Sequence, residues 1–379
     1  MCEPYVAGNE WRYVKECLDT GWVSSVGSFV DRFEKEFAAR VGVRFAVAMS
    51  SGTAALHIAA LVAGIEPGDE VVAPAVTFIA PLNAMRYAGA WPTVVDVEPD
   101  YWQLDAREAR RFLADDCERR DGVLVNRHTG RRVRALMPVD ILGHPVELDA
   151  IHALADEFAL TVIEDATESL GARYQDRPLG QRSPITCFSF NGNKLITTGG
   201  GGMLVCDDET TAKRARYLAT QAKDDPLEYV HGIVGYNYRL TNVLAAMGCA
   251  QLEQLDAFIA KKRGIAARYT EALRDVPGIT PMREAPWAFS AFWLFTVLVD
   301  EGRFGMDSRA LLRRLADAKI QCRPLWQPMH QSAAHAGSWS RACPVAESIH
   351  ARALSLPCSV GLTDGDQERV IAAIRAAAR

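Results

Sequence analysis

The sequence lacks the short motifs that most directly indicate nucleotide or metal chemistry. It has no Gly-x-x-x-x-Gly-Lys-Ser/Thr loop, and no Gly-x-Gly-x-x-Gly follows an early strand-like run, which argues against a P-loop or a dinucleotide fold. The nine cysteines are scattered, odd in number and never spaced as metal pairs. That distribution favours free thiols in a reducing cytoplasm over disulfides or a metal site.

Long unbroken hydrophobic runs and a large excess of one charge are also lacking. The segment 45–65 has no Asp, Glu, Lys or Arg, but the turn residues 50–53 (SSGT) divide it into a strand and a helix, so we reject a membrane span. The N-terminus, with Glu3, Glu10 and Arg12, is not typical of a signal peptide. A net charge of −5 gives no reason to expect nucleic acid. We therefore expect a cytoplasmic protein without a membrane or nucleic-acid partner.

Strand-like and helix-like runs alternate through the first two-thirds of the 379 residues, and the pattern becomes mainly helical from about residue 242. This alternation predicts an α/β fold, with a mostly parallel sheet covered by helices on both faces. We expect a large domain over 1–250, a smaller α+β domain over 251–379, and an exposed hairpin or loop over 119–132. The predicted strands are 45–49, 70–73, 93–97, 134–138, 160–165, 187–190, 202–206 and 292–299, and the predicted helices are 53–63, 77–88, 150–158, 245–275, 308–318 and 364–378.

Lysine is scarce, and one of the eight lysines stands apart. The other seven lie near acidic or basic residues, mostly on helix-like stretches, and are interpreted as solvated. Lys194 has no charged neighbour and lies in FSFNGNKLITTGGGGM (188–203), just before four consecutive glycines. A partly buried lysine without a counter-charge presents a neutral amine, which condenses with carbonyls such as pyridoxal phosphate. The alternative is a surface lysine whose stem lies beside a glycine-rich turn.

A carboxylate stands at the end of the buried, strand-like run LTVIED (160–165). In open α/β sheets the carboxyl ends of the strands face the ligand crevice, so Asp165 is expected to point into it. Pyridoxal phosphate needs such a carboxylate beside its pyridine nitrogen, because the negative charge keeps that nitrogen protonated. Asp165 and Lys194 could therefore meet across one ring. The alternative is that Asp165 caps a helix that begins with Ala166.

The turn SGTAAL (51–56) has the features of an anion site. A strand, a small-residue turn and a helix start leave free N–H groups and the positive end of a helix dipole facing a phosphate, and Thr53 adds a hydroxyl. The alternative is an ordinary capped helix.

Five segments extend these observations into a family resemblance: SGTAALH (51–57), PAVTFIAPLNA (74–84), IEDATESLGA (163–172), FSFNGNKLITTGGGG (188–202) and GYNYRLTNVLAA (235–246). Together they resemble the DegT/StrS nucleotide-sugar aminotransferases, a branch of the fold-type I pyridoxal phosphate enzymes. The resemblance runs from about Gly21 to His330. It implies an aspartate-aminotransferase-like fold with a seven-stranded type of sheet, and a homodimer whose active sites are shared between subunits.

By this resemblance, the catalytic residues are Lys194, which forms the Schiff base, and Asp165, which pairs with the pyridine nitrogen. Glu168 is expected near the phenolic oxygen of the ring, where many relatives have Gln. Phe78 is expected to stack on the ring, with plain core packing as its alternative. The resemblance assigns the remaining cofactor contacts to Gly52, Thr53, Ala54, Ser189 and Asn237. Of these, Asn237 is expected to reach the phosphate bound by the neighbouring subunit.

The resemblance further implies substrate contacts at Asn191, Arg239 and His330, and no metal. A structural histidine is the alternative at His330. FNGNK (190–194) and RPLWQPMH (323–330) resemble enzymes that aminate UDP-2-acetamido-2,6-dideoxy-4-ketohexoses at C4, with L-glutamate as the donor in a ping-pong cycle. The alternatives are amination at C3, a dTDP- or GDP-sugar, a non-sugar fold-type I enzyme, and a pyridoxal phosphate-binding regulator.

Overall fold

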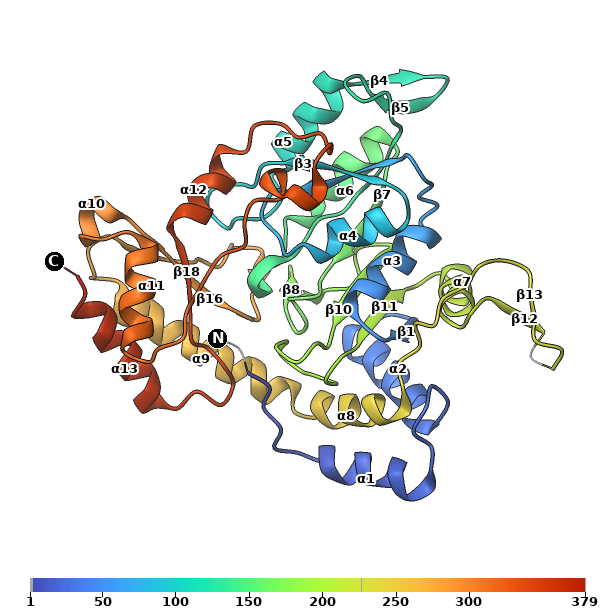
Figure 1. Ribbon diagram of the computed structural model, residues 1–379, viewed down its shortest axis with the longest axis horizontal. Helices are drawn as coiled ribbons and strands as arrows, with labels where there is room; N and C mark the ends of the chain where they lie inside the picture. Colours follow the sequence, from blue (N-terminus) through green and yellow to red (C-terminus); the bar gives the residue numbers. More distant parts are fainter. Residues whose placement is uncertain (1–2, 226, 379) are drawn as a thin grey trace.

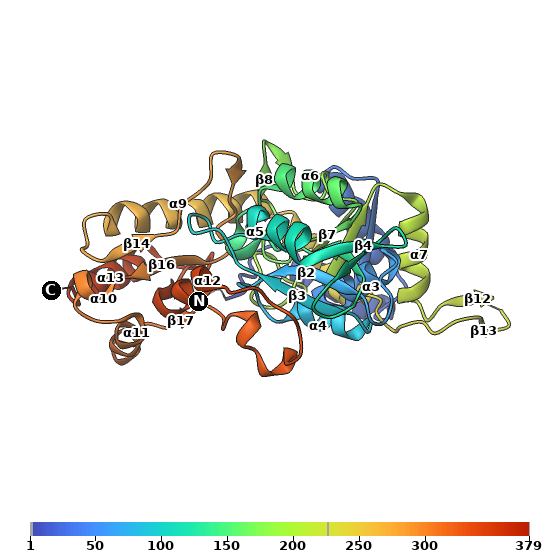
Figure 2. The same ribbon diagram turned by 90° about the horizontal axis from the view of Figure 1, so that it is seen from above.

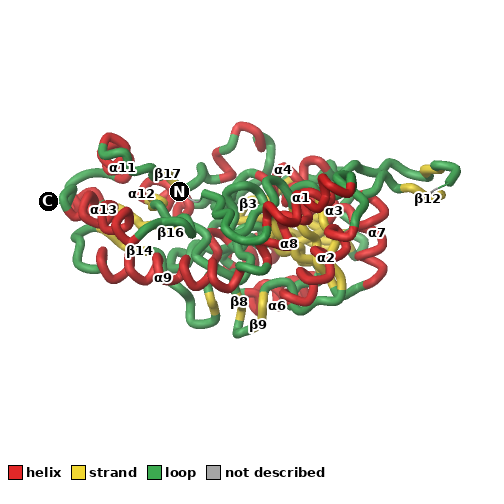
Figure 3. Tube along the Cα trace, turned by 90° about the horizontal axis from the view of Figure 1, so that it is seen from below, coloured by secondary structure: helices red, strands yellow, loops and turns green. Residues whose placement is uncertain are grey.

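The computed structural model describes residues 3–225 and 227–378. At its centre lies a seven-stranded sheet in the order β1-β11-β10-β7-β6-β2-β3, visible in Figure 3 as yellow strands among red helices. Neighbouring strands are parallel except at β11, which runs antiparallel to both β10 and β1. The α/β class and the mostly parallel sheet are thereby confirmed. The strands are β1 (Phe45–Met49), β2 (Glu70–Pro74), β3 (Trp91–Val95), β6 (Val133–Leu136), β7 (Thr161–Asp165), β10 (Ile185–Ser189) and β11 (Gly202–Cys206).

Helices cover both faces of the sheet, because its strands bury side chains on both sides. Along β2, Val71 and Ala73 belong to one apolar cluster and Val72 to another, as the alternation of a doubly covered strand requires. Helices α3, α4 and α7 contribute to the first cluster, and α1, α2, α5, α6 and α8 to the second. Their bounds are α1 (Glu10–Thr20), α2 (Ser28–Val41), α3 (Gly52–Val62), α4 (Ala80–Tyr87), α5 (Ala106–Arg111), α6 (Leu148–Phe158), α7 (Glu209–Ala219) and α8 (Asn242–Leu252).

The C-terminal third forms a second lobe, on the left in Figure 1. The long helix α9 (Leu255–Leu273) leads into a four-stranded antiparallel sheet in the order β14-β16-β18-β17. This architecture agrees with the α+β pattern expected there, while the boundary at residue 250 stays a prediction. The other elements of the lobe are β14 (Ile279–Pro281), β16 (Phe295–Val299), α10 (Glu301–Phe304), α11 (Ser308–Asp317), β17 (Arg323–Pro324), α12 (Pro344–Arg352), β18 (Ala353–Leu356) and α13 (Asp364–Arg375).

Two hairpins and a small sheet complete the fold. The hairpin of β4 (Cys117–Arg120) and β5 (Val123–Asn126) agrees with the one expected around 119–132. A second hairpin, β12 (Lys223–Asp225) with β13 (Val230–His231), projects away from the body as an arm in Figures 1 and 2. The three-stranded sheet contains β15 (Ala288–Phe289), β8 (Arg173–Tyr174) and β9 (Arg177–Pro178), so it joins the second lobe to the first. Single helical turns lie at Phe112–Asp116, Ile141–Gly143, Met329–Gln331 and Ala333–His335.

Three sequence expectations need correction or completion. The single helix predicted over 245–275 is two helices, α8 and α9, with a 61° bend between them. Within the described residues, no single helix is both long and apolar enough to cross a membrane, and only this bent pair matches by length and composition. Helices α1, α2, α5, α7 and α12 were not predicted.

Eight cysteines are buried free thiols, and Cys2 lies outside the described residues.

Candidate active site

The order of the strands brings the predicted chemical residues to one edge of the sheet. Strands β7 and β10 are parallel neighbours with Asp165 opposite Cys187, so both end at the same edge. Asp165 is the last residue of β7 and Ser189 the last residue of β10. The loop that follows β10 carries Lys194. No helix follows Asp165 directly, since residues 166–172 form turns, and the alternative of a helix cap at Asp165 is therefore wrong.

Two glycines allow the start of α3 to approach this edge closely. A Cβ on Gly52 would lie 2.7 Å from the Cβ of Ser189, and a Cβ on Gly202 would lie 2.3 Å from the carbonyl oxygen of Ser51. Any larger residue would push the helix start away from the ends of β10 and β11. Helix α3 begins at Gly52, and the Ser51 hydroxyl caps it by accepting a hydrogen bond from the Ala54 N–H at 3.0 Å.

A cavity of about 280 Å³ opens at this edge. Seven of the predicted site residues line it: Gly52, Thr53, Phe78, Glu168, Ser189, Asn191 and Lys194. The rest of the lining was not predicted from the sequence and comprises Ser51, Leu56, Ala80, Thr167, Asn193, Gly200, Gly201, Trp293 and Trp326.

Asp165 lies fully buried beside the cavity. Its Oδ1 accepts a hydrogen bond from the Thr167 N–H at 3.0 Å, whereas Oδ2 has no hydrogen-bond partner among the described residues. Burial raises the pKa of Asp165, and both the Thr167 hydrogen bonds and the nearby positive charge of Lys194 oppose that rise. An unsatisfied buried carboxylate oxygen is costly unless a ligand completes it, so Oδ2 is suited to meet a protonated ring nitrogen.

Lys194 is not isolated from charge, contrary to the interpretation of its sequence neighbourhood. Its Nζ lies 3.7 Å from Glu168 Oε1, with its side chain only 13% exposed. The other oxygen of Glu168, Oε2, accepts a hydrogen bond from the Leu142 N–H at 2.8 Å. Burial raises the pKa of Glu168 to about 7, although Lys194 pulls it down. The counter-charge was missed because Glu168 is distant in sequence and reaches Lys194 only through the pairing of β7 with β10.

A second lysine also departs from its predicted place. Lys262, interpreted as solvated, is 1% exposed on the buried side of α9. Its Nζ donates hydrogen bonds to the carbonyl oxygens of Trp293 at 2.7 Å and Cys358 at 2.5 Å. Buried ammonium groups require such partners. Lys262 does not line the cavity.

The structure adds two tryptophans to the site. The Trp293 ring lies beneath the Lys194 amine, with Nζ 4.0 Å from the ring centroid. Trp326 stacks near Trp293, with centroids 6.4 Å apart, and meets Phe78 edge to face at 6.3 Å. Trp326 belongs to the motif RPLWQPMH, so the sequence did contain a signal for its place in the site. Trp293 lies in an apolar run typical of a buried strand, and no sequence signal distinguishes it as a site residue.

Besides Asp165, which lies beside the cavity, four predicted residues do not line the cavity of this single chain. The Ala54 N–H is already used by the Ser51 cap. Asn237 is exposed at the base of the arm, in a bridge to Thr220. Arg239 bridges Met49 and has a buried Nε without a partner among the described residues. His330 Nε2 lies 2.9 Å from Glu347 Oε1. Their proposed ligand contacts stay predictions.

The cavity has the features that pyridoxal phosphate requires. A lysine amine and a helix start that glycine keeps open border the cavity, and an unsatisfied buried carboxylate oxygen lies beside it. Lys194 would bond the aldehyde carbon, Asp165 would meet the pyridine nitrogen, and Gly52, Thr53 and Ser189 would hold the phosphate. Among the residues that the structure describes, no cluster of His, Cys, Asp or Glu is arranged to hold a metal ion.

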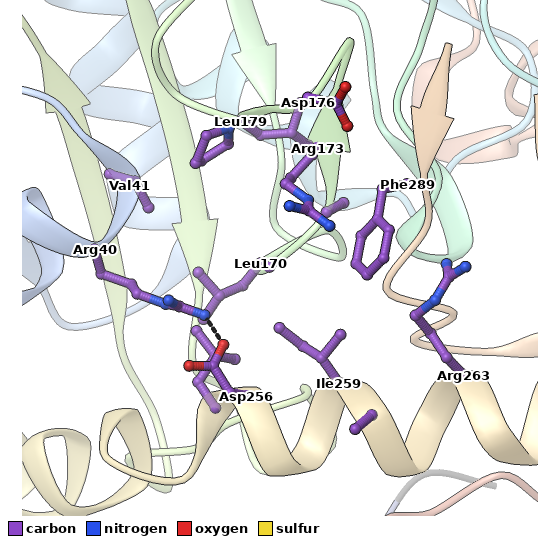
Figure 4. Close-up of a pocket in the computed structure, with 15 residues that line it drawn as sticks. Arg40, Val41, Leu170, Arg173, Asp176, Leu179, Asp256, Ile259, Arg263 and Phe289 are labelled. Carbon is purple, nitrogen blue, oxygen red and sulfur yellow. Dashed lines mark hydrogen bonds and ion pairs between the residues drawn. The ribbon is translucent and has the colours of Figure 1, made fainter. Parts of the chain in front are cut away.

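A larger cavity of about 390 Å³ lies elsewhere, between the end of α2, the loop around β8 and the start of α9, and is drawn in Figure 4. Two of its arginines already have carboxylate partners, Arg40 with Asp256 and Arg263 with Glu284. Its lining contains no lysine, histidine or cysteine. We therefore assign the chemistry to the smaller cavity.

Comparisons with known proteins agree with this geometry. The family model described as the DegT/DnrJ/EryC1/StrS aminotransferase family matches residues 4–375. EpsN of Bacillus subtilis (strain 168), named as a pyridoxal phosphate-dependent aminotransferase, is 38% identical over 98% of this chain and 93% of its own length. GDP-perosamine synthase of Caulobacter vibrioides is 38% identical over 99% of this chain and 96% of its own. The crystal structure of DesV from S. venezuelae in complex with a ketimine intermediate is 33% identical, with a TM-score of 0.88 over 98% of this chain and 95% of that chain.

Proposed function

We propose that this chain, which belongs to the DegT/DnrJ/EryC1/StrS aminotransferase family, moves an amino group from L-glutamate to C4 of a nucleotide-linked 4-keto-6-deoxy sugar. The broader activity is not in question: the chain is a pyridoxal phosphate-dependent nucleotide-sugar aminotransferase. The donor, the carbon atom and the nucleotide are the proposal. The observation that carries it is the convergence of Lys194, Glu168 and Trp326 on one cavity beside the unsatisfied Oδ2 of Asp165.

The protein residues supply proton transfer and orientation. Bound pyridoxal phosphate supplies an electron sink for the carbanion that forms when the donor loses its α-proton. Lys194 Nζ, when not covalently engaged, is placed to take that proton and return it on the cofactor side. Asp165 Oδ2 would hold the proton on the ring nitrogen throughout. Glu168, whose pKa burial raises to about 7, can keep a proton near neutral pH where relatives with Gln present an amide N–H.

The nucleotide has two candidates. The motifs FNGNK and RPLWQPMH favour a UDP-2-acetamido-2,6-dideoxy-4-ketohexose. The name of the Caulobacter vibrioides relative, GDP-perosamine synthase, favours a GDP-linked sugar. Both substrates present a keto group at C4 and a 6-methyl group. The rings of Phe78 and Trp326, which line the cavity and are partly exposed, suit the apolar face of a deoxy sugar.

A second copy of the chain would complete the mouth of the site. The arm around β12 and β13 exposes Leu227 and Val234, 85% and 81% accessible, on a projecting hairpin (Figure 2). Such exposed apolar residues favour burial against a partner. Asn237 at the base of the arm does not line the cavity of its own chain. We infer a homodimer in which Asn237 contacts the phosphate bound by the partner.

A substrate panel tests the proposal. Purified enzyme loaded with pyridoxal phosphate is incubated with L-glutamate and with UDP-, GDP- and dTDP-4-keto-6-deoxy sugars, and 2-oxoglutarate release is measured. We expect release with a 4-keto sugar only, and NMR of the product should locate the new amine at C4. Amination at C3, or turnover of glutamate without any sugar, would contradict the proposal. The nucleotide with the highest kcat/KM decides between the two candidates.

A further inference from the structure

We propose that Trp293 is a positioning residue that holds the Lys194 amine whenever it is not covalently bound to the cofactor. The indole ring lies under Nζ, 4.0 Å away at its centroid, a distance at which an ammonium is attracted to the ring face. The indole N–H also donates a hydrogen bond to the carbonyl oxygen of Asn193 at 2.7 Å. One side chain therefore contacts both the lysine amine and the peptide immediately before that lysine.

The ring is itself held firmly. Trp293 is 3% exposed, and its carbonyl oxygen accepts a hydrogen bond from Lys262 Nζ at 2.7 Å. The Leu294 N–H donates to the carbonyl oxygen of Leu142 at 3.3 Å. A Cβ on Gly143 would lie 2.5 Å from the Trp293 nitrogen, so the two backbones are in closest contact. The second lobe thus places Trp293 against the loop 141–143 of the first lobe.

The same loop also holds the carboxylate that lies close to the amine. Leu142 donates its N–H to Glu168 Oε2 at 2.8 Å, and Glu168 Oε1 lies 3.7 Å from Lys194 Nζ. The amine is therefore close to both an indole face and a carboxylate, and loop 141–143 contacts the residues that carry them. The titratable groups that act on Lys194 are Glu168 and, more distantly, Asp165. We infer that the position of the free Lys194 amine depends on how the second lobe, which carries Trp293, packs against loop 141–143, which holds Glu168.

The inference rests on the pyridoxal phosphate chemistry of the proposed function but not on its sugar, so its test contains no sugar. Cofactor-free enzyme is mixed with pyridoxal phosphate, and borohydride traps the adduct on Lys194 for mass spectrometry, at a series of pH values. Trp293→Phe keeps a weaker ring and loses the indole N–H, and Trp293→Leu removes both contacts. Trp11→Phe, at a site 76% exposed on α1, is the matched control.

At the plateau the amine is neutral, so the rate of capture there reports how well Lys194 is positioned. We expect it to fall by up to about 10²-fold in Trp293→Leu, the range for a reacting group displaced by about 1 Å, and to fall less in Trp293→Phe. We also expect the midpoint of rate against pH to move to lower pH, because the ring that favours the ammonium form is gone. A purely structural tryptophan would lower thermal stability without moving that midpoint. Unchanged rate and midpoint in both variants would overturn the inference. If Trp293→Leu does not fold, an unchanged rate and midpoint in Trp293→Phe is sufficient by itself to overturn the inference. A failed sugar panel leaves this result untouched.

Discussion

The floor of the cavity and its mouth differ in how much of each a single chain supplies. We call Glu168, Lys194 and the adjacent Asp165 the floor. All three are buried or nearly so, and Lys194 Nζ lies 3.7 Å from Glu168 Oε1. At the mouth, Phe78 is 50% exposed, and the predicted substrate residues Arg239 and His330 do not line the cavity. Cofactor chemistry needs rigid, desolvated groups, whereas a nucleotide sugar must enter and leave. The buried floor comes from a single chain, whereas the predicted substrate contacts at Arg239 and His330 lie outside its cavity, so we predict that specificity depends on more than this chain's cavity.

The largest expected effect comes from removing the lysine of the floor. Lys194→Ala should lose turnover by more than about 10⁴-fold, the upper end of what acid–base catalysis alone contributes, because the covalent anchor is lost as well. The visible absorbance of the enzyme-bound cofactor should disappear with it. Lys213→Ala, at a surface lysine paired with Glu209, is the control and should behave as wild type. Measurable turnover in Lys194→Ala would mean that another group anchors the cofactor.

Removing the charge of the floor should have the next largest effect. Asp165→Asn keeps the acceptor for the Thr167 N–H but loses the negative charge at the ring nitrogen. We expect kcat to fall by about 10²–10³-fold, the range for one well-placed electrostatic contact. The borohydride-trapped adduct on Lys194 should still form, since that lysine is intact. A wild-type kcat would show that another acid partners the ring.

A complementation experiment tests whether the mouth is shared between subunits. Lys194→Ala and Asn237→Ala should each be poorly active alone. In mixed dimers, one site carries both changes and the other carries neither, so random mixing should restore about one quarter of wild-type activity. Activity that never exceeds the sum of the two separate variants would place Asn237 outside the partner's site.

The arm offers an independent check on the same dimer. Val234→Asp places a charge on an exposed apolar residue of the arm, and light scattering should then show a lower molar mass than wild type. Val123→Asp, on the separate β4–β5 hairpin and 37% exposed, is the control and should leave the mass unchanged. A wild-type mass for Val234→Asp would exclude this surface from the interface.

The smallest effect concerns the titration of the floor. Burial raises the pKa of Glu168 from an ordinary 4.5 to about 7, so between these pH values the folded protein keeps a proton that the unfolded chain has lost. The contribution of Glu168 to the stability of the cofactor-free protein should therefore be fully present below pH 4.5. It should be lost as pH rises through 7, which lowers the free energy of unfolding by on the order of 3 kcal/mol. Glu168→Gln should flatten that slope in urea unfolding at pH 5 and 8. Glu209→Gln, at a surface position, is the control and should leave the pH dependence of stability unchanged. An unchanged pH dependence in Glu168→Gln would show that Glu168 does not have a raised pKa.

Much of the sheet could be predicted because its signal is local. The strands expected at 45–49 and 202–206 match β1 and β11 residue for residue, since uncharged runs bounded by turns leave little choice. Two missed features also carried local signals. Phe29, Phe33 and Phe37 recur at the helical period of α2, and all three are buried.

Lys262 shows the same lesson within a predicted helix. It shares the buried side of α9 with Phe258, Ile265 and Tyr269, a spacing of three to four residues that places it on the apolar stripe. At such a position the helical spacing indicates burial more reliably than the charge of the side chain indicates exposure. Trp293 is different, because its contact with Lys194 joins two lobes and no local pattern encodes it.

The sequence by its own patterns predicted that a lysine after one strand and an aspartate at the end of another serve pyridoxal phosphate, because strand ends and turn glycines are encoded in short segments. Only the fold decided that Glu168 and Trp293 lie close to that lysine, that Lys262 is buried, and that Asn237 does not line its own cavity. Such contacts depend on strand pairing and on the docking of one lobe against another, and these arise from the summed packing of distant residues.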